Sequence, residues 1–165
     1  MEATLEQKTR PDWEMYFSYM AMLAAERSTC LRRKVGAVAV KDHRVLATGY
    51  NGAPSGIEDC LQRNYCEREE QGIPSGQRHE ICRGLHAEQN LIIQAAYEGT
   101  SIASSSIYCT TFPCFICSKM LVNVGIKELI YLTGYNDPMT RDLLEQAEIP
   151  YRKIDVPELT LKNDF

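Results

Sequence analysis

Two short motifs constrain this chain more than any other part of its sequence. In the first, HAE, the residues His86 and Glu88 stand two positions apart, and in the second, PCFIC, the residues Cys114 and Cys117 stand three apart. Imidazole and thiolate groups are zinc ligands, and three of them leave the metal one open position, as in catalytic zinc sites. The chain therefore needs a fold that brings these two segments to one point.

Both motifs are predicted to lie at the amino-terminal ends of helices. Residues two apart on a regular helix point away from each other, so we expect His86 at or just before the start of a helix over 87–97, with Glu88 in its first turn. A second helix, predicted from about Pro113 to Asn123, puts both cysteine sulfurs on one face of its first turn. Backbone N–H groups at such an end favour the thiolate form that a metal needs.

The other hydrophobic patterns predict strands and helices in alternation. An amphipathic helix follows Asp12, a residue type that caps helices well, and a β-hairpin comes next. Strands separated by helices of this length usually pair in parallel. We therefore expect an α/β fold, a three-layer α-β-α arrangement with a five-stranded mixed sheet and helices on both faces. The predicted segments are helices over 12–28 and 138–147, hairpin strands over 35–40 and 45–50, and strands over 106–111, 127–133 and 151–156.

The composition fits one compact domain. The chain has 165 residues, of which 44% are apolar, so we expect a single domain over 1–165 with a core at about 12–154 and a tail at 155–165. The net charge of −4 disfavours a polynucleotide partner. No apolar run approaches the roughly 20 residues that cross a bilayer, and the first residues lack a signal-peptide core. We expect no membrane association and a cytoplasmic location.

The segment 52–85 does not fit the alternating pattern. Its periodicity is weak, and a loop this long inside a compact domain needs a function or a cross-link that orders it. The chain has seven cysteines, which in a reducing cytosol indicate metal binding or catalysis, although an isolated one such as Cys109 fits a buried core position better. The spacing of His79 and Cys82 is that of a zinc pair. The segment contains Cys60, Cys66, His79 and Cys82.

These motifs resemble those of a known family. The stretches HAEQN and TTFPCFIC, with the predicted order of elements over about 12–154, resemble the zinc-dependent cytidine and deoxycytidylate deaminase superfamily, whose signature is H-x-E followed by P-C-x-x-C. Within it, GYNGAPSG at 49–56 followed by RHEICRGLHAEQN looks like the deoxycytidylate deaminase branch. The resemblance implies a cytidine-deaminase-like fold and the hydrolysis of dCMP to dUMP, a thymidylate precursor.

The resemblance also implies roles for individual residues. Zinc would be held by His86, Cys114 and Cys117, while Glu88 would move a proton between water and the cytosine ring. The family pattern assigns the sugar and phosphate end of the nucleotide to Asn51, although an ordinary turn residue is the alternative there. Weaker candidates for substrate contacts are the backbone of Ala87 at the pyrimidine, and Tyr135 and Arg33 at the phosphate, Arg33 lying in a charged run that fits a solvated surface equally well.

A second, structural zinc is implied by the same resemblance. Cys30, Cys60 and His79 match three of its ligands, but Gly84 stands where some relatives have an acidic ligand. We therefore expect Cys82 to complete the site, with Cys66 as the alternate. The resemblance further implies a homo-oligomer, commonly a hexamer, and regulation by dCTP and dTTP with Mg²⁺.

Two other functions remain open from the sequence. The same zinc chemistry could act on another nucleoside, base or nucleotide, or on a pterin-like intermediate. The chain could instead be a non-catalytic binding module stabilised by zinc. Glu88 argues against the second alternative, because a purely structural zinc site does not need that acid.

Overall fold

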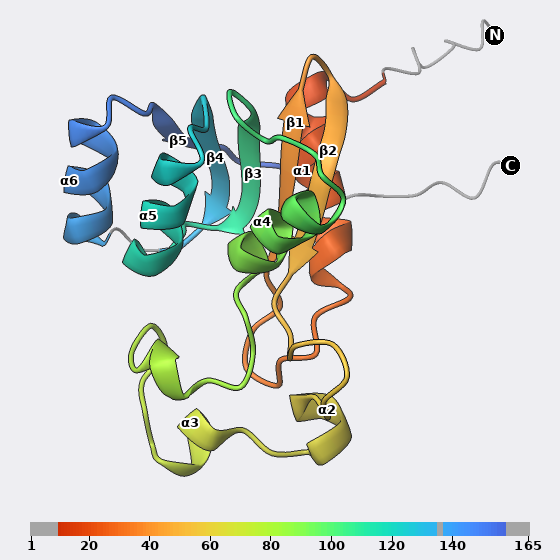
Figure 1. Cartoon of the computed structure of the whole chain (residues 1–165), viewed down its shortest axis with the longest axis vertical. Helices are drawn as coiled ribbons and strands as arrows, with labels where there is room; N and C mark the ends of the chain where they lie inside the picture. The colour runs from red at the N-terminus through yellow and green to blue at the C-terminus, as the bar shows by residue number, and fades with distance from the viewer. Residues whose placement is uncertain (1–9, 135–136, 158–165) are drawn as a thin grey trace, which may run out of the picture.

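The computed structural model describes residues 10–134 and 137–157, and within them one five-stranded sheet forms the centre of the fold. The strand order is β2-β1-β3-β4-β5 (Figure 1). β1 pairs antiparallel with β2 and β3, whereas β3, β4 and β5 run parallel, so the predicted mixed sheet is confirmed. The strands are β1 Gly36–Lys41, β2 Arg44–Tyr50, β3 Ser106–Thr111, β4 Glu128–Thr133 and β5 Tyr151–Lys153.

Helices cover both faces of the sheet, which confirms the three-layer arrangement. The main helices are α1 Trp13–Ala25, α4 Ala87–Tyr97, α5 Phe115–Asn123 and α6 Pro138–Gln146. On one face, Phe17 and Ala21 of α1 pack against strand residues that include Val38 and Ile130. On the other face, residues from α4, α5 and α6 form a larger cluster with the sheet; it includes Leu91, Leu121, Leu129 and Leu144.

Several predicted boundaries differ from the structure by one to three residues; the helix predicted over 12–28, for example, ends at Ala25. The α5 helix begins at Phe115 rather than Pro113, because Cys114 has an extended backbone and acts as the N-cap residue. The last strand ends at Lys153 instead of Val156, since its pairing with β4 covers only three positions. The predicted cap at Asp12 is confirmed, because its carboxylate accepts a hydrogen bond from the backbone N–H of Met15 at 2.8 Å.

Residues 52–85 form a lobe at one end of the molecule (Figure 1). Gly52 and Leu85 pair as an isolated antiparallel bridge, with N–H to C=O distances of 3.1 and 2.9 Å, and this bridge ties the two ends of the lobe together. Three short helical turns, which the weak periodicity did not predict, order its interior: α2 Cys60–Arg63, α3 Glu67–Glu70 and η1 His79–Ile81. In the described residues, no helix has the length and apolar character needed to cross a membrane.

Candidate active site

The two helices that supply the zinc motifs begin next to each other. Helix α4 approaches β2 so closely that a Cβ atom on Gly49 would lie 2.1 Å from the carbonyl oxygen of Ala87 and 2.5 Å from the backbone nitrogen of Leu91. Only glycine permits this approach. Helix α5 follows β3, the strand next to β1, and therefore starts near the same end of the sheet. The close packing of α4 against β2 therefore places His86 and Glu88 near the start of α5, where Cys114 and Cys117 lie.

His86 lies just before helix α4, as its spacing from Glu88 predicts. Its backbone is extended, with φ −76° and ψ 161°, and its backbone N–H donates a 2.8 Å hydrogen bond to the Gln89 side chain. This reciprocal contact fixes the entry to the helix. The imidazole can therefore turn toward α5 while Glu88, in the first helical turn, remains inside the same pocket.

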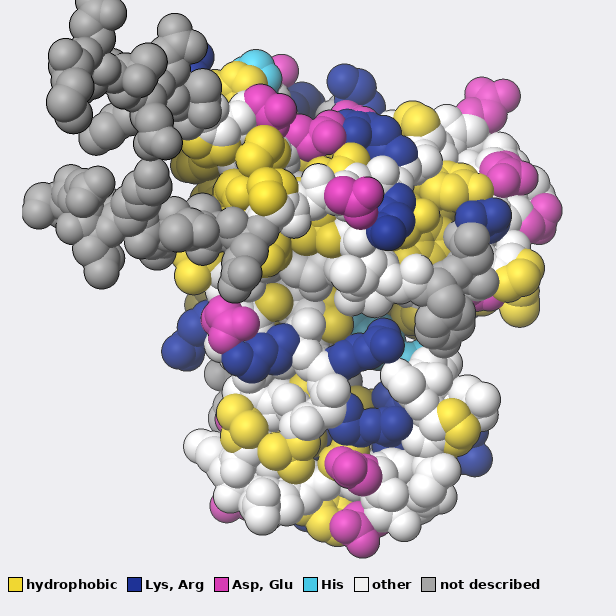
Figure 2. All heavy atoms as spheres, turned by 180° about the vertical axis from the view of Figure 1, so that it is seen from behind, with side chains coloured by type: hydrophobic (Ala, Val, Ile, Leu, Met, Phe, Trp, Pro, Cys, Tyr) yellow, Lys and Arg dark blue, Asp and Glu magenta, His cyan; other side chains and the backbone are white. Residues whose placement is uncertain are grey.

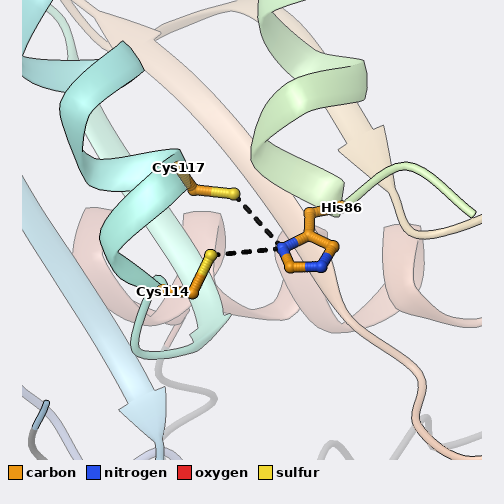
Figure 3. A group of neighbouring side chains, drawn as sticks. All are labelled: His86, Cys114 and Cys117. Carbon is orange, nitrogen blue, oxygen red and sulfur yellow. Dashed lines mark hydrogen bonds between the residues drawn. The ribbon is translucent and has the colours of Figure 1, made fainter. Parts of the chain in front are cut away.

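The imidazole of His86 faces both cysteine sulfurs (Figure 3). Its Nδ1 atom lies 3.4 Å from Sγ of Cys114 and 3.3 Å from Sγ of Cys117, and all three ligand atoms lie within 4.8 Å of one another. Two ligands of a tetrahedral zinc ion, one nitrogen and one sulfur, are separated by roughly 3.5 Å at ordinary bond lengths. The three side chains therefore fit zinc, and they are the one such group of three or more in the described part of the chain.

The same cluster stabilises a thiolate. A hydrogen bond from Cys117, assisted by His86, lowers the pKa of Cys114 to about 3. The shared proton and burial raise the pKa of Cys117, and the hydrogen bond with Cys114 raises the pKa of His86. A metal cation binds the thiolate form of cysteine and the neutral imidazole of histidine, so this pair of groups is suited to hold one.

Glu88 is an acid buried against this cluster. Only 3% of its surface is exposed, and burial raises its pKa above the ordinary range for a glutamate. Its carboxyl lies within hydrogen-bonding reach of Cys117. Desolvation makes this carboxyl group easier to protonate than one in water, which suits a group that takes up and releases a proton.

A cavity of about 360 Å³ opens from the metal ligands toward the lobe. His86, Ala87, Glu88 and Cys114 line it at the metal ligands. The rest of the wall comes from the 29–35 loop, Asn51, the lobe, residues 111–113, and Gly134, Asp137 and Pro138. Its size is within the range of pockets that enclose a small organic ligand.

Asn51 lines the cavity but uses its side chain to hold a loop. Its Oδ1 accepts a 2.8 Å hydrogen bond from the backbone N–H of Val35, and its Nδ2 donates one of 2.8 Å to the carbonyl of Arg33. Asn51 therefore shapes the 30–35 loop that forms one wall of the cavity.

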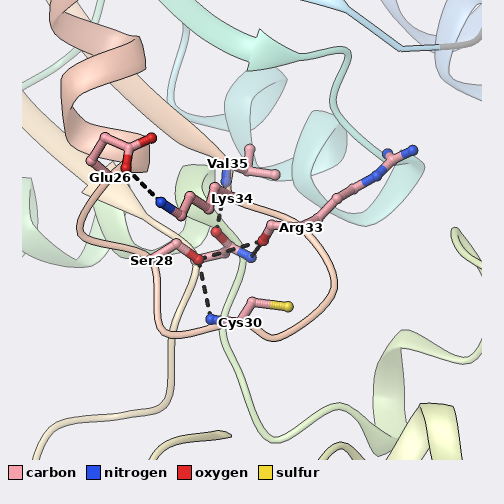
Figure 4. A network of polar contacts seen from close by, with 7 residues as sticks. Glu26, Ser28, Cys30, Arg33, Lys34 and Val35 are labelled. Carbon is pink, nitrogen blue, oxygen red and sulfur yellow. Dashed lines mark hydrogen bonds and ion pairs between the residues drawn. The ribbon is translucent and has the colours of Figure 1, made fainter. Parts of the chain in front are cut away.

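Arg33 lies at the same wall, and its guanidinium is in none of the ion pairs found in the described part of the chain. Neighbouring Lys34 is paired with Glu26, whereas the Arg33 side chain extends away from this polar network (Figure 4). Because Arg33 lines the cavity, its side chain can reach a phosphate group that is bound there. The other candidate for the phosphate end, Tyr135, lies outside the described residues.

The residues expected to bind a second zinc also border the cavity. Burial raises the pKa of the Cys60 thiol, and Cys30, Cys66 and Cys82 act in the same direction, but no three of these residues bring their ligand atoms within 4.8 Å of one another in the described part of the chain. His79 instead packs its ring edge-on against His86, with the ring centroids 4.6 Å apart.

Arg68 is a cavity residue that sequence reasoning missed. It belongs to the acidic run EREE, where an arginine is expected to be exposed to solvent. Only 9% of its surface is exposed, however. Its guanidinium reaches the cavity from α3. Nothing in the local sequence distinguishes it from the exposed arginines of the lobe.

Known proteins resemble this chain in sequence and in structure. The model of the cytidine and deoxycytidylate deaminase zinc-binding region matches residues 11–133. The deoxycytidylate deaminase of Schizosaccharomyces pombe is 42% identical and aligns with 90% of this chain and 46% of its own length. That of Mycobacterium phage D29 is 40% identical and aligns with 74% of this chain and 96% of its own length.

A solved structure has the same fold. The dCMP deaminase from the cyanophage S-TIM5, determined in complex with dCMP and dUMP, is 33% identical, has a TM-score of 0.73 and covers 88% of this chain and 99% of its own. The chain spans about half the length of the deoxycytidylate deaminases of Schizosaccharomyces pombe and Saccharomyces cerevisiae, 46% and 47% respectively.

Proposed function

The chain belongs to the cytidine and deoxycytidylate deaminase zinc-binding family, and from that premise we propose that it hydrolyses dCMP to dUMP and ammonia. One observation carries the proposal: the imidazole and the two sulfurs converge at 3.3 and 3.4 Å beside a buried glutamate. A solved relative with the same fold was determined with dCMP and dUMP, which supports this substrate over other cytosine compounds.

The proposed chemistry divides the roles between the ligands and the acid. His86, Cys114 and Cys117 would hold a zinc ion, which would supply Lewis-acid chemistry that activates water near neutral pH. Glu88 accepts a proton from the attacking water, delivers it to N3 of the cytosine ring and helps protonate the departing ammonia. The buried backbone of Ala87 borders the cavity where the pyrimidine edge would bind. Water and dCMP give dUMP and ammonia, so the reaction needs no redox partner.

Initial velocities with several substrates test this proposal directly. The zinc-loaded protein should deaminate dCMP with a higher kcat/KM than deoxycytidine or cytosine. Equal turnover of dCMP and deoxycytidine would argue against a site that recognises phosphate. If the protein turns over none of these cytosine compounds, the alternative function, a non-catalytic binding module, is favoured.

Effector binding and assembly extend the proposal. We propose activation by dCTP and inhibition by dTTP, both with Mg²⁺, in a homohexamer located in the cytoplasm. The seven free cysteines are compatible with a reducing compartment. Adding dCTP or dTTP to the dCMP assay tests regulation; velocities that ignore both nucleotides would contradict it.

A second, structural zinc in the lobe is also part of the proposal. Cys30, Cys60 and Cys82 are its proposed ligands, with either His79 or Cys66 as the fourth. The effect of the other thiols on the pKa of Cys60 supports this set, and the packing of His79 against His86 favours Cys66. The backbone N–H of Arg32, 3.4 Å from Sγ of Cys30, would stabilise a thiolate there.

Metal analysis of the purified protein tests the second zinc. We expect the zinc content per chain to be about double that of the catalytic site alone. Cys60→Ser should lower both this zinc content and Tm. Cys109→Ser is the control for zinc content, because Cys109 is buried in β3 and is not a proposed ligand. Comparing Cys66→Ser with His79→Ala identifies the fourth ligand, and zinc content equal to one ion per chain would contradict the second site.

A further inference from the structure

Buried polar atoms without hydrogen-bond partners gather around the active-site cavity. Buried polar groups in native proteins nearly always have partners, so a group of exceptions calls for an explanation. Within the described part of the chain, such atoms include Nε of Arg68, Nη1 of Arg32 and Nδ1 of His79, and all three residues line this cavity.

Arg68 is the most constrained of these residues. It is 9% exposed, and one of its terminal nitrogens donates a 3.2 Å hydrogen bond to the carbonyl of Pro74, which fixes the guanidinium in place. Its Nε has no hydrogen-bond partner among the residues that the structure describes. Although it is flanked by glutamates in α3, Arg68 forms none of the ion pairs found among the described residues. An arginine that is held by one group and free at another can bind an anion.

The cavity has an excess of positive charge near Arg68. Arg32 and Arg33, on the loop before β1, line the same cavity. The acids of the cavity wall are Glu88, which lies at the metal ligands, and Asp137, whose carboxylate caps α6 through Met139 and Thr140. Figure 2 shows Lys and Arg side chains around the hollow between the lobe and the sheet domain. A negatively charged group is therefore favoured on the lobe side of the cavity.

We propose that Arg68, together with Arg32, binds the phosphate of the nucleotide whose base lies at the metal ligands. This assignment rests on the proposed function and makes the lobe part of the substrate site. Arg68 comes from the lobe and Arg32 from the loop before β1, so substrate phosphate would connect two separate parts of the molecule. The guanidinium fork of arginine matches the geometry of phosphate oxygens.

Steady-state kinetics of Arg68→Gln in the zinc-loaded, full-length protein test the proposal. We expect kcat/KM for dCMP to fall roughly 10- to 100-fold, mainly through KM, while kcat/KM for deoxycytidine stays within about twofold. Arg68→Lys, which keeps the charge without the fork, should give an intermediate loss for dCMP. A purely structural role for Arg68 would lower turnover of both substrates alike, and that result would overturn the proposal.

A matched control removes a different charge from the same lobe. Arg78 is exposed and paired with Glu80, so Arg78→Gln should leave both substrates unaffected. If Arg68→Gln does not fold, Arg68→Lys and Arg32→Gln provide the same comparison of dCMP with deoxycytidine. A dCMP preference that is unchanged in both would refute phosphate binding.

Calorimetry with products separates this proposal from the proposed activity. The wild-type protein should bind dUMP more tightly than deoxyuridine, and Arg68→Gln should reduce that preference at least tenfold. Inorganic phosphate should compete with dUMP in the wild type and less in the variant. If the wild type deaminates no cytosine compound, the deaminase proposal fails, while the binding data still decide the role of Arg68. Equal preference for dUMP in wild type and variant would exclude that role.

Discussion

At the scale of single residues, Glu88 combines burial with a position beside the metal ligands. We predict that Glu88→Gln, which keeps the shape of the side chain, lowers kcat for dCMP by roughly 10²- to 10⁴-fold because the proton shuttle is lost. Zinc content should remain at the wild-type level, since Glu88 is not a proposed ligand. Glu98→Gln on the same helix is the control, because Glu98 is exposed. Activity that survives Glu88→Gln would refute the assigned role.

Asn51 is a second single residue that shapes the site, because its side chain holds the backbone of the 30–35 loop. Asn51→Ala removes the hydrogen bonds to Val35 and to Arg33, both 2.8 Å long. We expect a loss of about 1 kcal/mol in the free energy of unfolding, because the half-buried N–H of Val35 is left without this partner. Urea denaturation measures this loss, and KM for dCMP should rise in parallel as the cavity wall loosens. Unchanged stability would show that the loop does not depend on these two bonds.

At the scale of elements, the position of helix α4 depends on Gly49. Gly49→Ala would place a Cβ atom 2.1 Å from the carbonyl oxygen of Ala87, so the helix that supplies His86 and Glu88 must move. We predict a stability loss of about 1–3 kcal/mol or more, together with a large fall in kcat and in zinc affinity. Denaturation, metal titration and kinetics measure these effects.

Gly36→Ala is the matched control for this prediction. Its Cβ atom would meet the carbonyl oxygen of Ala21, again at 2.1 Å, but in α1 on the opposite face of the sheet. We expect a similar loss of stability with kcat of the folded fraction preserved. A loss of kcat as large as that of Gly49→Ala would mean that the site responds to general destabilisation and not to the position of α4.

At the scale of the whole molecule, the outer face of α4 exposes large apolar side chains. Tyr97 is 88% exposed and Ile93, one helical turn earlier, is 49% exposed. Exposed apolar groups favour association, so we predict that this face contacts another copy of the chain in the proposed oligomer. The double change Ile93→Glu and Tyr97→Glu should reduce the molecular mass measured by light scattering. Met139→Glu on α6, where Met139 is 59% exposed, is the control. A mass unchanged by the double change would place the interface elsewhere.

Local sequence patterns determined most of the elements and the metal chemistry. Helical and strand periodicities gave the hairpin, the alternating segments and the cap at Asp12, because such signals depend on neighbouring residues. The spacing of His86 and Glu88 required the first residue to precede the helix, and the structure confirms this. The proline-cysteine motif identified the other two ligands, although the helix begins after Cys114 instead of before it.

Only the tertiary structure decided which distant residues share the cavity. Arg68 looked like a solvated member of an acidic run, but the fold of the lobe buries it beside the active site. Asn51 holds the 30–35 loop through two hydrogen bonds, and His79 packs its ring against His86. The two Asn51 contacts join residues 16 and 18 positions apart in the chain. The sequence by itself therefore determined the elements and the reactive groups, whereas long-range packing, which no local pattern encodes, decided how they surround the substrate.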